Sequence, residues 1–241
     1  MVRHHLVLVM NQHVPMSSIL RRQAAAECLG TFFLLLAVVG SGIMAAQLSP
    51  SDVGLELLQN SFATAGALAC LILVFSKASG AHFNPVVTMW ARIEGDLDNR
   101  GALTYIGAQV SGGVLGAIAA NVIFDLDPIT WSTTNRGDWT LWVSEVIATF
   151  GLVMVIVGVV RSGKERFVAF AVAAYIGGAY FFTSSTSFAN PAVTVARMFS
   201  DTFAGIRPAD APQFVIAQVV GAGLAIGAMR FVYGGDEEST A

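Results

Sequence analysis

The stretch Gly80-Ala81-His82-Phe83-Asn84-Pro85-Val86-Val87-Thr88 has a second copy later in the chain, Ser187-Phe188-Ala189-Asn190-Pro191-Ala192-Val193-Thr194. Asn is favoured as a helix N-cap and Pro at the first helical position, so each Asn-Pro pair predicts the start of a helix. About ten residues of helical, largely apolar sequence follow each pair. That length is too short to span a bilayer, and it suits a half-helix that enters the membrane from one side.

The composition is that of a membrane protein. Of the 241 residues, 55% are hydrophobic and 12% are charged, about half the charged fraction of a soluble domain. The net charge of −3 argues against nucleic-acid binding. The two cysteines are too few for a disulfide framework and lack the spacing of a metal site, so we expect neither a metal nor a cofactor.

Six apolar segments are long enough to cross a bilayer, which takes about 20 residues per helix. They cover residues 19–47, 57–75, 103–124, 139–160, 167–182 and 211–232. The fold class predicted from this pattern is an all-α membrane protein with six transmembrane helices. The two Asn-Pro stretches lie between the second and third segments and between the fifth and sixth.

Positive charge is distributed unevenly over the connecting segments. If the N-terminus lies inside, ten of the 13 Lys and Arg residues fall on the inner side and only Arg136, Arg197 and Arg207 fall outside. Cytoplasmic loops carry the excess of Lys and Arg in membrane proteins. We therefore expect both termini in the cytoplasm and a multi-pass location in the inner (plasma) membrane.

The two halves of the chain also share sequence features other than the Asn-Pro pairs. Glu27 in the first segment matches Glu145 in the fourth, and Ala108-Gln109-Val110 in the third matches Ala217-Gln218-Val219 in the sixth. Each repeat then holds three spanning helices and one half-helix. Because three is odd, the second repeat must be inverted relative to the first, which brings the half-helices together at the midplane.

Two half-helices that meet at their N-termini suit a pore for neutral molecules. Each helix dipole places a partial positive charge at the centre, and Asn84 and Asn190 can direct amide donors into the lumen. Such a centre repels cations and orients passing water as a hydrogen-bond acceptor. A single Asn-Pro pair is more often an ordinary helix cap in a loop; two copies at matching places in a repeat favour the pore.

With these motifs the sequence resembles the aquaporin and aquaglyceroporin (major intrinsic protein) family over residues 22–232. The resemblance rests on the segments Ala26-Glu27-Cys28-Leu29-Gly30-Thr31-Phe32, Ser79-Gly80-Ala81-His82-Phe83-Asn84-Pro85, Ala108-Gln109, Glu145 and Asn190-Pro191-Ala192. It implies six helices with two re-entrant half-helices, a pore centre formed by the two triplets, and a homotetramer in the lipid bilayer. It also implies passive conduction of water or small neutral solutes.

The resemblance divides the chain into three parts. The channel domain is expected at 18–233, with repeat one at about 18–124 and repeat two at about 138–233. Residues 1–17 are expected to form a flexible cytoplasmic tail, and residues 234–241 an acidic tail. Whether the chain starts at Met1, Met10 or Met16 is left open.

Four positions of the family's outer constriction carry over by their spacing from the two Asn residues. They fall on Thr64, Gly178, Ser187 and Val193. None of these is aromatic, and Val193 replaces the family's arginine. We therefore expect a wide filter that passes glycerol, urea or metalloid hydroxides such as arsenous acid. With these residues at the filter, the sequence most resembles the bacterial branch of the family that is linked to arsenic resistance.

Four other polar residues are expected near the pore. Glu27 and Glu145 lie in spanning helices, and we expect each carboxylate to brace a re-entrant loop by accepting hydrogen bonds from its backbone. His82 either lines the inner mouth or braces the loop. Arg197, seven residues after Asn190, returns to the same helix face; it either adds charge to the outer vestibule or holds the half-helix structurally.

Three other functions share some of these sequence features. A strict water channel shares the same fold. An ion-coupled secondary transporter also has inverted repeats and broken helices, yet it usually carries several ionisable midplane residues, and only Glu27 and Glu145 qualify here. An intramembrane enzyme needs a nucleophile-base pair or a metal cluster, and the spans contain neither. The physiological solute, the direction of net flux and any gating are left open.

Overall fold

The computed structural model describes residues 16–234, and its regular structure in this range is entirely helical. The two expected tails lie outside the described residues, apart from the few that border the first and last helices. The question of the start residue lies outside them as well.

Six long helices are apolar enough to cross a membrane, which confirms the predicted spans. They are α1 (Met16–Leu48), α2 (Val53–Ser79), α4 (Asn99–Ile123), α5 (Trp139–Arg161), α6 (Val168–Phe182) and α8 (Ala211–Tyr233). A short 3-10 turn, η1 (Glu165–Phe167), precedes α6 and belongs to its span, which runs over Glu165–Phe182. Some helices begin before the apolar segment, because a polar N-cap residue stabilises an additional turn. At the start of α2, for example, the Asp52 carboxylate accepts a hydrogen bond from the Leu55 amide.

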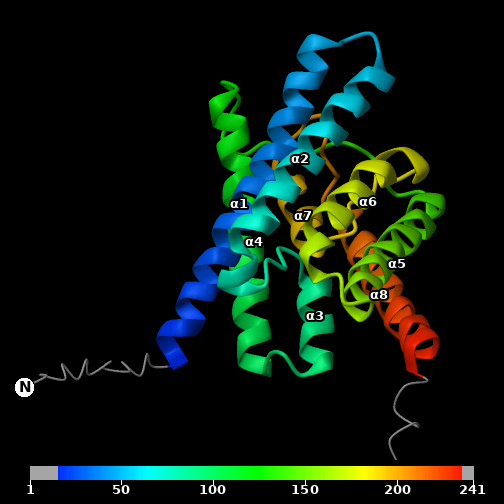
Figure 1. The fold of residues 1–241 in the computed structure, drawn as a ribbon. Coiled ribbons are helices and arrows are strands. Elements are labelled where there is room, and N and C mark those ends of the chain that lie inside the picture. The colour runs from blue at the N-terminus through cyan, green and yellow to red at the C-terminus, as the bar shows by residue number, and fades with distance from the viewer. Residues whose placement is uncertain (1–15, 235–241) are drawn as a thin grey trace, which may run out of the picture.

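The two Asn-Pro stretches begin short helices, as predicted. They are α3 (Pro85–Glu94) and α7 (Pro191–Ala196), and α7 tightens into the 3-10 turn η2 (Arg197–Phe199). Asn84 and Asn190 are the N-caps, and their side-chain oxygens accept hydrogen bonds from the first free amides of the helices. In Figure 1, α3 lies in the lower half of the molecule and α7 lies above it.

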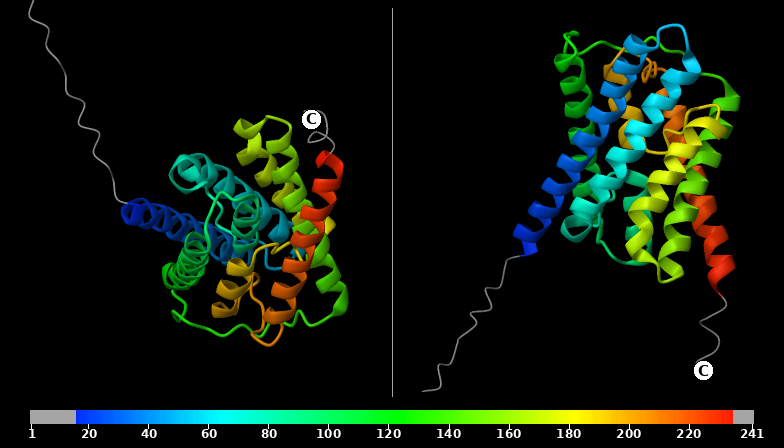
Figure 2. Two further views of the ribbon diagram at one scale, coloured as in Figure 1. Left: turned by 90° about the horizontal axis from the view of Figure 1, so that it is seen from below. Right: turned by 45° about the horizontal axis from the view of Figure 1, so that its top comes forward.

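The helices pack in two equivalent groups. In the first group α1 packs against α2 and α4, and in the second α5 packs against α6 and α8. Contacts between α2 and α6 join the groups, and each half-helix crosses to the other group, α3 onto α8 and α7 onto α4. Viewed along the bundle, α7 lies between α4 and α8 (Figure 2), and both half-helices contact these two long helices. The inverted repeat is therefore visible in the packing.

Glycine allows the helices to approach closely. A methyl group added to Gly112 or Gly116 in α4 would lie only 2.1 Å or 2.2 Å from the α1 carbonyl oxygens of Cys28 or Phe32. Gly221 in α8 meets the backbone of α5 in the same way. Small residues at such crossings let two backbones pack directly in a membrane, where no hydrophobic effect drives helices together.

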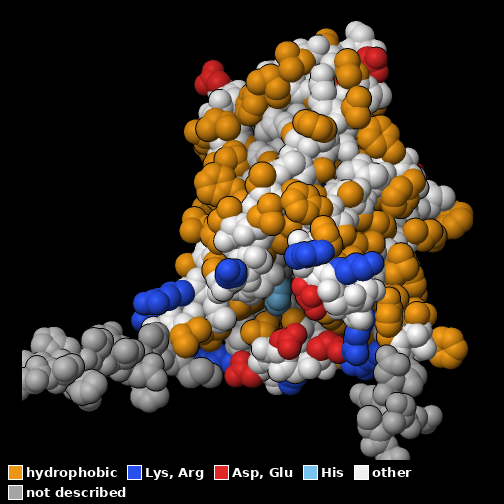
Figure 3. Space-filling view, in the orientation of Figure 1, with side chains coloured by type: hydrophobic (Ala, Val, Ile, Leu, Met, Phe, Trp, Pro, Cys, Tyr) orange, Lys and Arg blue, Asp and Glu red, His pale blue; other side chains and the backbone are white. Residues whose placement is uncertain are grey.

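The two ends of the bundle differ in charge. α1 begins and α8 ends at the same end of the molecule (Figure 1), which we name the inner end, with the opposite end as the outer. Hydrophobic side chains cover the middle and upper part of the face in Figure 3, whereas Lys, Arg, Asp and Glu gather toward the inner end. Large exposed apolar residues on the long helices, such as Phe62, Leu103 and Ile216, are consistent with a lipid-facing surface.

Candidate pore and its re-entrant loops

A cavity of about 570 Å³ is lined by residues of both repeats. Its wall includes Asn84 and Asn190. Toward the inner end it includes Lys77, His82, Glu165 and Arg166, and toward the outer end Thr64, Tyr180, Ser187, Phe188, Val193 and Arg197. Apolar side chains of α1, α2, α5 and α6 complete the wall. This wall has a few fixed polar groups on an otherwise apolar surface.

The two asparagines tie the loops to each other. Asn84 Nδ2 donates to the carbonyl oxygen of Ala189 at 2.8 Å, and Asn190 Nδ2 donates to that of Phe83 at 2.8 Å. Each side-chain oxygen meanwhile caps its own half-helix. An amide nitrogen has two hydrogens, so each asparagine keeps one donor for the cavity that it lines.

The backbone before each asparagine has an unusual conformation. The residues three and one positions before Asn84, Ala81 and Phe83, have φ angles of 52° and 49°, and the matching Ser187 and Ala189 have 50° and 48°. A left-handed conformation costs a non-glycine residue on the order of 1 kcal/mol or more. Such loops persist only where their surroundings hold them firmly.

Glu27 holds the first loop. Its carboxylate accepts hydrogen bonds from the Ser79 hydroxyl at 2.6 Å, from the amides of His82 and Phe83 at 3.0 Å and 2.7 Å, and from Gln109 Nε2 at 2.7 Å. The side chain is fully buried. Hydrogen bonds to a charged acceptor are stronger than neutral ones, so one carboxylate satisfies backbone groups that lipid could not.

Glu145 repeats this arrangement in the second loop. It accepts from the Ser185 hydroxyl at 2.6 Å, from the amides of Phe188 and Ala189 at 2.9 Å each, and from Gln218 Nε2 at 2.7 Å. It is also fully buried. This is the geometry of the loop brace that the sequence led us to expect, and it leaves neither carboxylate on the cavity wall.

His82 has both of the roles that the sequence left open. Its ring lies on the cavity wall, and Nδ1 lies 3.1 Å from the Thr88 hydroxyl on α3. Gln109 also donates to Thr88. The matching position in the second loop is Phe188, so this polar link exists only in the inner half.

The outer end of the wall corrects one predicted filter residue. Thr64, Ser187 and Val193 line the cavity as expected, but Gly178 does not; its place is taken by Tyr180. The Tyr180 hydroxyl donates to Thr64 Oγ1 at 3.2 Å.

Helix periodicity explains the correction. The α6 residues on the wall are Ala169, Val172, Ile176 and Tyr180, which recur every three or four positions along one face. Gly178 lies on the opposite, exposed side of the helix. The prediction of Gly178 used only its distance in sequence from Asn190 and took no account of which helix face points to the cavity. Two aromatic residues outside the four predicted positions, Tyr180 and Phe188, also belong to the wall.

Four residues assigned to the pore centre lie outside the wall. Pro85, Val86, Pro191 and Ala192 occupy the first turns of the half-helices and are buried, but none lines the cavity. Val86 packs in a cluster with α5 and α8 residues. Their part is to start the half-helices and pack them, so of the six residues assigned to the pore centre only the two asparagines line the cavity.

Arg197 lies on the outer wall and is almost completely buried, with 2% of its surface exposed. Its Nε donates to the carbonyl oxygen of Ala204, and its Cζ lies 3.4 Å from the centroid of the Phe188 ring. The residue therefore holds the half-helix to the next loop and also faces the cavity.

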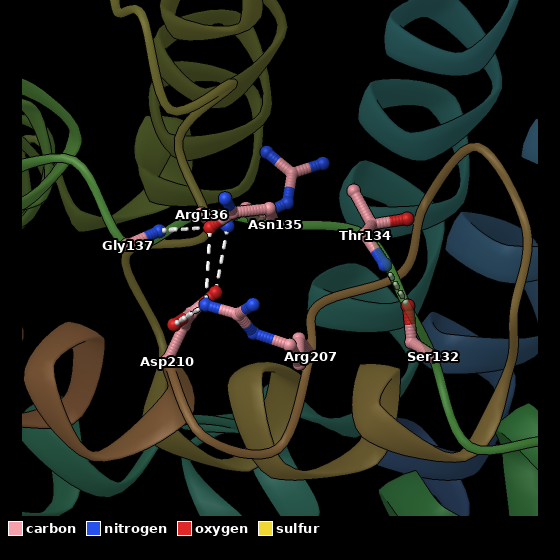
Figure 4. Close-up of polar contacts among 7 residues, drawn as sticks. All are labelled: Ser132, Thr134, Asn135, Arg136, Gly137, Arg207 and Asp210. Atoms are coloured by element: carbon pink, nitrogen blue, oxygen red, sulfur yellow. Dashed lines mark hydrogen bonds and ion pairs between the residues drawn. The ribbon is translucent and has the colours of Figure 1, made fainter.

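Arg136 in the segment between α4 and α5 ties the outer loops together. Its Nε donates to Gly205 O at 2.9 Å, its Nη1 to Ser185 O at 3.2 Å, and its amide to Asp210 Oδ2 at 2.8 Å. Asp210 also pairs with Arg207 at 2.8 Å (Figure 4). Burial lowers the pKa of Arg136 to about 10, which leaves it charged at neutral pH.

Some of these residues were not predicted. Ser79 and Ser185 lie five residues before Asn84 and Asn190, so an alignment of the two repeats could have found them. Nothing in the sequence pattern marks Arg136, because its three partners come from distant segments.

Within residues 16–234, no group of three or more His, Cys, Asp or Glu side chains is placed to hold a metal ion. The sequence pattern described as "Major intrinsic protein" matches residues 15–184, more than half of the chain. The chain belongs to the major intrinsic protein family. It is 46% identical over 213 residues to aquaglyceroporin AqpS of Rhizobium meliloti (strain 1021), a match that covers 88% of this chain and 91% of that relative.

The fold has a counterpart among solved structures. The X-ray structure of the aquaglyceroporin from Plasmodium falciparum superimposes with a TM-score of 0.66 at 23% identity, covering 89% of this chain and 96% of that one. This likeness supports the fold alone. Membership of the family confirms the predicted family and fold class, and it confirms that the chain is a channel protein rather than an enzyme.

Proposed function

We propose that this chain is a passive channel for small neutral solutes, such as glycerol, urea and metalloid hydroxides like arsenous acid, and that it also conducts water. The single observation that carries the proposal is the residue at the outer wall three positions after Asn190. Val193 lines the cavity there with a short apolar side chain. An arginine at this position would fill part of the lumen.

The wall suits solutes that carry hydroxyl groups on a small carbon or metalloid core. Apolar side chains form most of it, and a few polar groups are fixed along it. The Asn84 and Asn190 amides, which line the cavity and each keep one N–H donor, can bind solute hydroxyls. The name of the relative AqpS, an aquaglyceroporin, points in the same direction.

The centre of the pore contributes to the exclusion of ions and protons. The half-helices direct their positive dipole ends toward it, and Asn84 and Asn190 each keep a donor for the lumen. A donor-lined site turns each water molecule so that it accepts hydrogen bonds on both sides, which interrupts a proton wire.

The membrane setting is part of the same proposal. The protein spans the inner (plasma) membrane with its inner end in the cytoplasm. Charged side chains gather at this end, where α1 begins and α8 ends (Figure 1, Figure 3). Four copies assemble as a homotetramer through the exposed apolar helix faces, each copy keeping its own pore. Light scattering of the detergent-solubilised protein at known detergent load would give the number of copies.

Val193→Arg tests the proposed width. We expect glycerol flux to fall about tenfold or more, equivalent to about 1.4 kcal/mol of added barrier, while water flux is retained to a much larger extent. Val193→Ile is the matched control, because it adds bulk without charge and should change little. Stopped-flow light scattering of proteoliposomes under glycerol and sucrose gradients measures both fluxes. Wild-type protein that passes water but no glycerol would contradict the proposal and favour a strict water channel.

A further inference from the structure

The two half-helix segments differ at one charged position on the cavity wall. Seven residues after Asn190, on the wall of the outer half, stands Arg197; seven residues after Asn84, the matching residue of the inner half is the buried Ala91. The capping asparagines, the bracing glutamates and the glutamines that reach them follow the repeat closely, and the other difference on the wall, His82 against Phe188, lies in the loops before the half-helices. A departure from symmetry on the wall itself is where a specific role is expected.

The guanidinium of Arg197 has few partners for so buried a group. Only Nε makes a hydrogen bond, and neither Nη atom has a hydrogen bond or ion pair with any residue between 16 and 234. An unpaired buried cation is costly unless something else stabilises it. The Phe188 ring, 3.4 Å below Cζ, provides one such contact, and the cavity next to the residue provides the other.

Arg197 begins η2 directly after α7, four residues and about 6 Å beyond Val193. A side chain of arginine length from that turn reaches the same part of the lumen from its outer side. The second arginine on the Phe188 ring, Arg136, lies 4.8 Å from the centroid but is engaged by two carbonyl oxygens and does not line the cavity.

We propose that Arg197 provides the fixed positive charge of the outer constriction, so that charge exclusion and pore width are set by two different residues, Arg197 and Val193. The inference rests on the proposed function as a channel for neutral solutes. One cation near the mouth repels Na⁺ and H₃O⁺ in a low-dielectric channel, and its free N–H groups can bind solute hydroxyls. Val193 meanwhile leaves the lumen open one turn deeper.

Arg197→Gln tests this division of roles. We expect Na⁺ or proton leak through proteoliposomes to rise about tenfold or more, while glycerol flux stays within about twofold of wild type. Arg207→Gln is the matched control, because Arg207 is also an outer arginine but is half exposed and absent from the cavity wall; it should change neither quantity. Melting temperature in detergent checks that each variant is folded.

Two further variants complete the test. Adding Val193→Arg to Arg197→Gln should restore ion exclusion and abolish most glycerol flux. Arg197→Lys keeps the charge, so this variant should exclude ions as well as wild type does. It is the variant that tests the inference if Arg197→Gln does not fold. Normal ion exclusion in a folded Arg197→Gln, or ion leak in a folded Arg197→Lys, would overturn the inference. Absence of glycerol flux in wild type would instead remove the proposed function itself.

Discussion

Glu145 shows how far a single residue can determine the geometry of this pore. Its carboxylate accepts four hydrogen bonds, two of them from backbone amides of a loop in left-handed conformation. No water can replace these bonds in a buried site, so the loop has the conformation that the carboxylate dictates. Glu27 does the same on the other side.

Glu145→Gln should therefore destabilise the protein strongly. The amide group of glutamine turns two donors toward a site that already contains only donors, and a buried group left unpaired costs about 3 kcal/mol. Thermal unfolding of the detergent-solubilised variant, followed by size-exclusion chromatography after heating, measures the effect. Asp127→Asn, at an exposed loop residue, is the control. Equal melting temperatures for the two variants would contradict the role of the brace.

At the same scale, the sequence predicted some site residues and missed others for clear reasons. Glu27 and Glu145 were found because a carboxylate in an apolar span needs donors, and the re-entrant loops have them. Gly178 was misplaced because its position came from spacing along the chain, which takes no account of the helix face. Tyr180 could have been found from the periodicity of α6.

At the scale of helices, the contact between α1 and α4 depends on which face a glycine occupies. Gly116 lies against the α1 backbone, whereas Gly107 on the same helix has nothing within 4 Å of an added methyl group. The six spans were predictable, because length and hydrophobicity decide them. The faces were harder to predict, because the weak amphipathicity of helices in lipid leaves little pattern to read.

Gly116→Ala should lower the melting temperature, because the new methyl group forces α1 and α4 apart. Gly107→Ala should leave it unchanged or raise it slightly, since alanine is favoured over glycine in a helix by about 1 kcal/mol. Both variants can be compared by fluorescence-detected thermal unfolding in the same detergent. If Gly107→Ala were the more damaging of the two, the packing of α1 on α4 described above would be wrong.

At the scale of the whole molecule, the inverted repeat forms the pore. The positions at which the two halves differ give the inner and outer parts of the wall different side chains. The repeat was predictable from matched marks such as Glu27 and Glu145. The differences between the halves, His82 against Phe188 and Arg197 against Ala91, are visible in the sequence, but their meaning depends on which side chains reach the cavity. That information requires the packed structure.

The central claim is passive, uncoupled movement of neutral solute through the cavity, and glycerol flux into proteoliposomes tests it most directly. Initial rates should rise in proportion to the glycerol gradient, and they should be the same with and without Na⁺ or proton gradients; protein-free liposomes give the background. Rates that saturate at low glycerol, or that collapse when the ion gradients are removed, would contradict the account and indicate a coupled transporter.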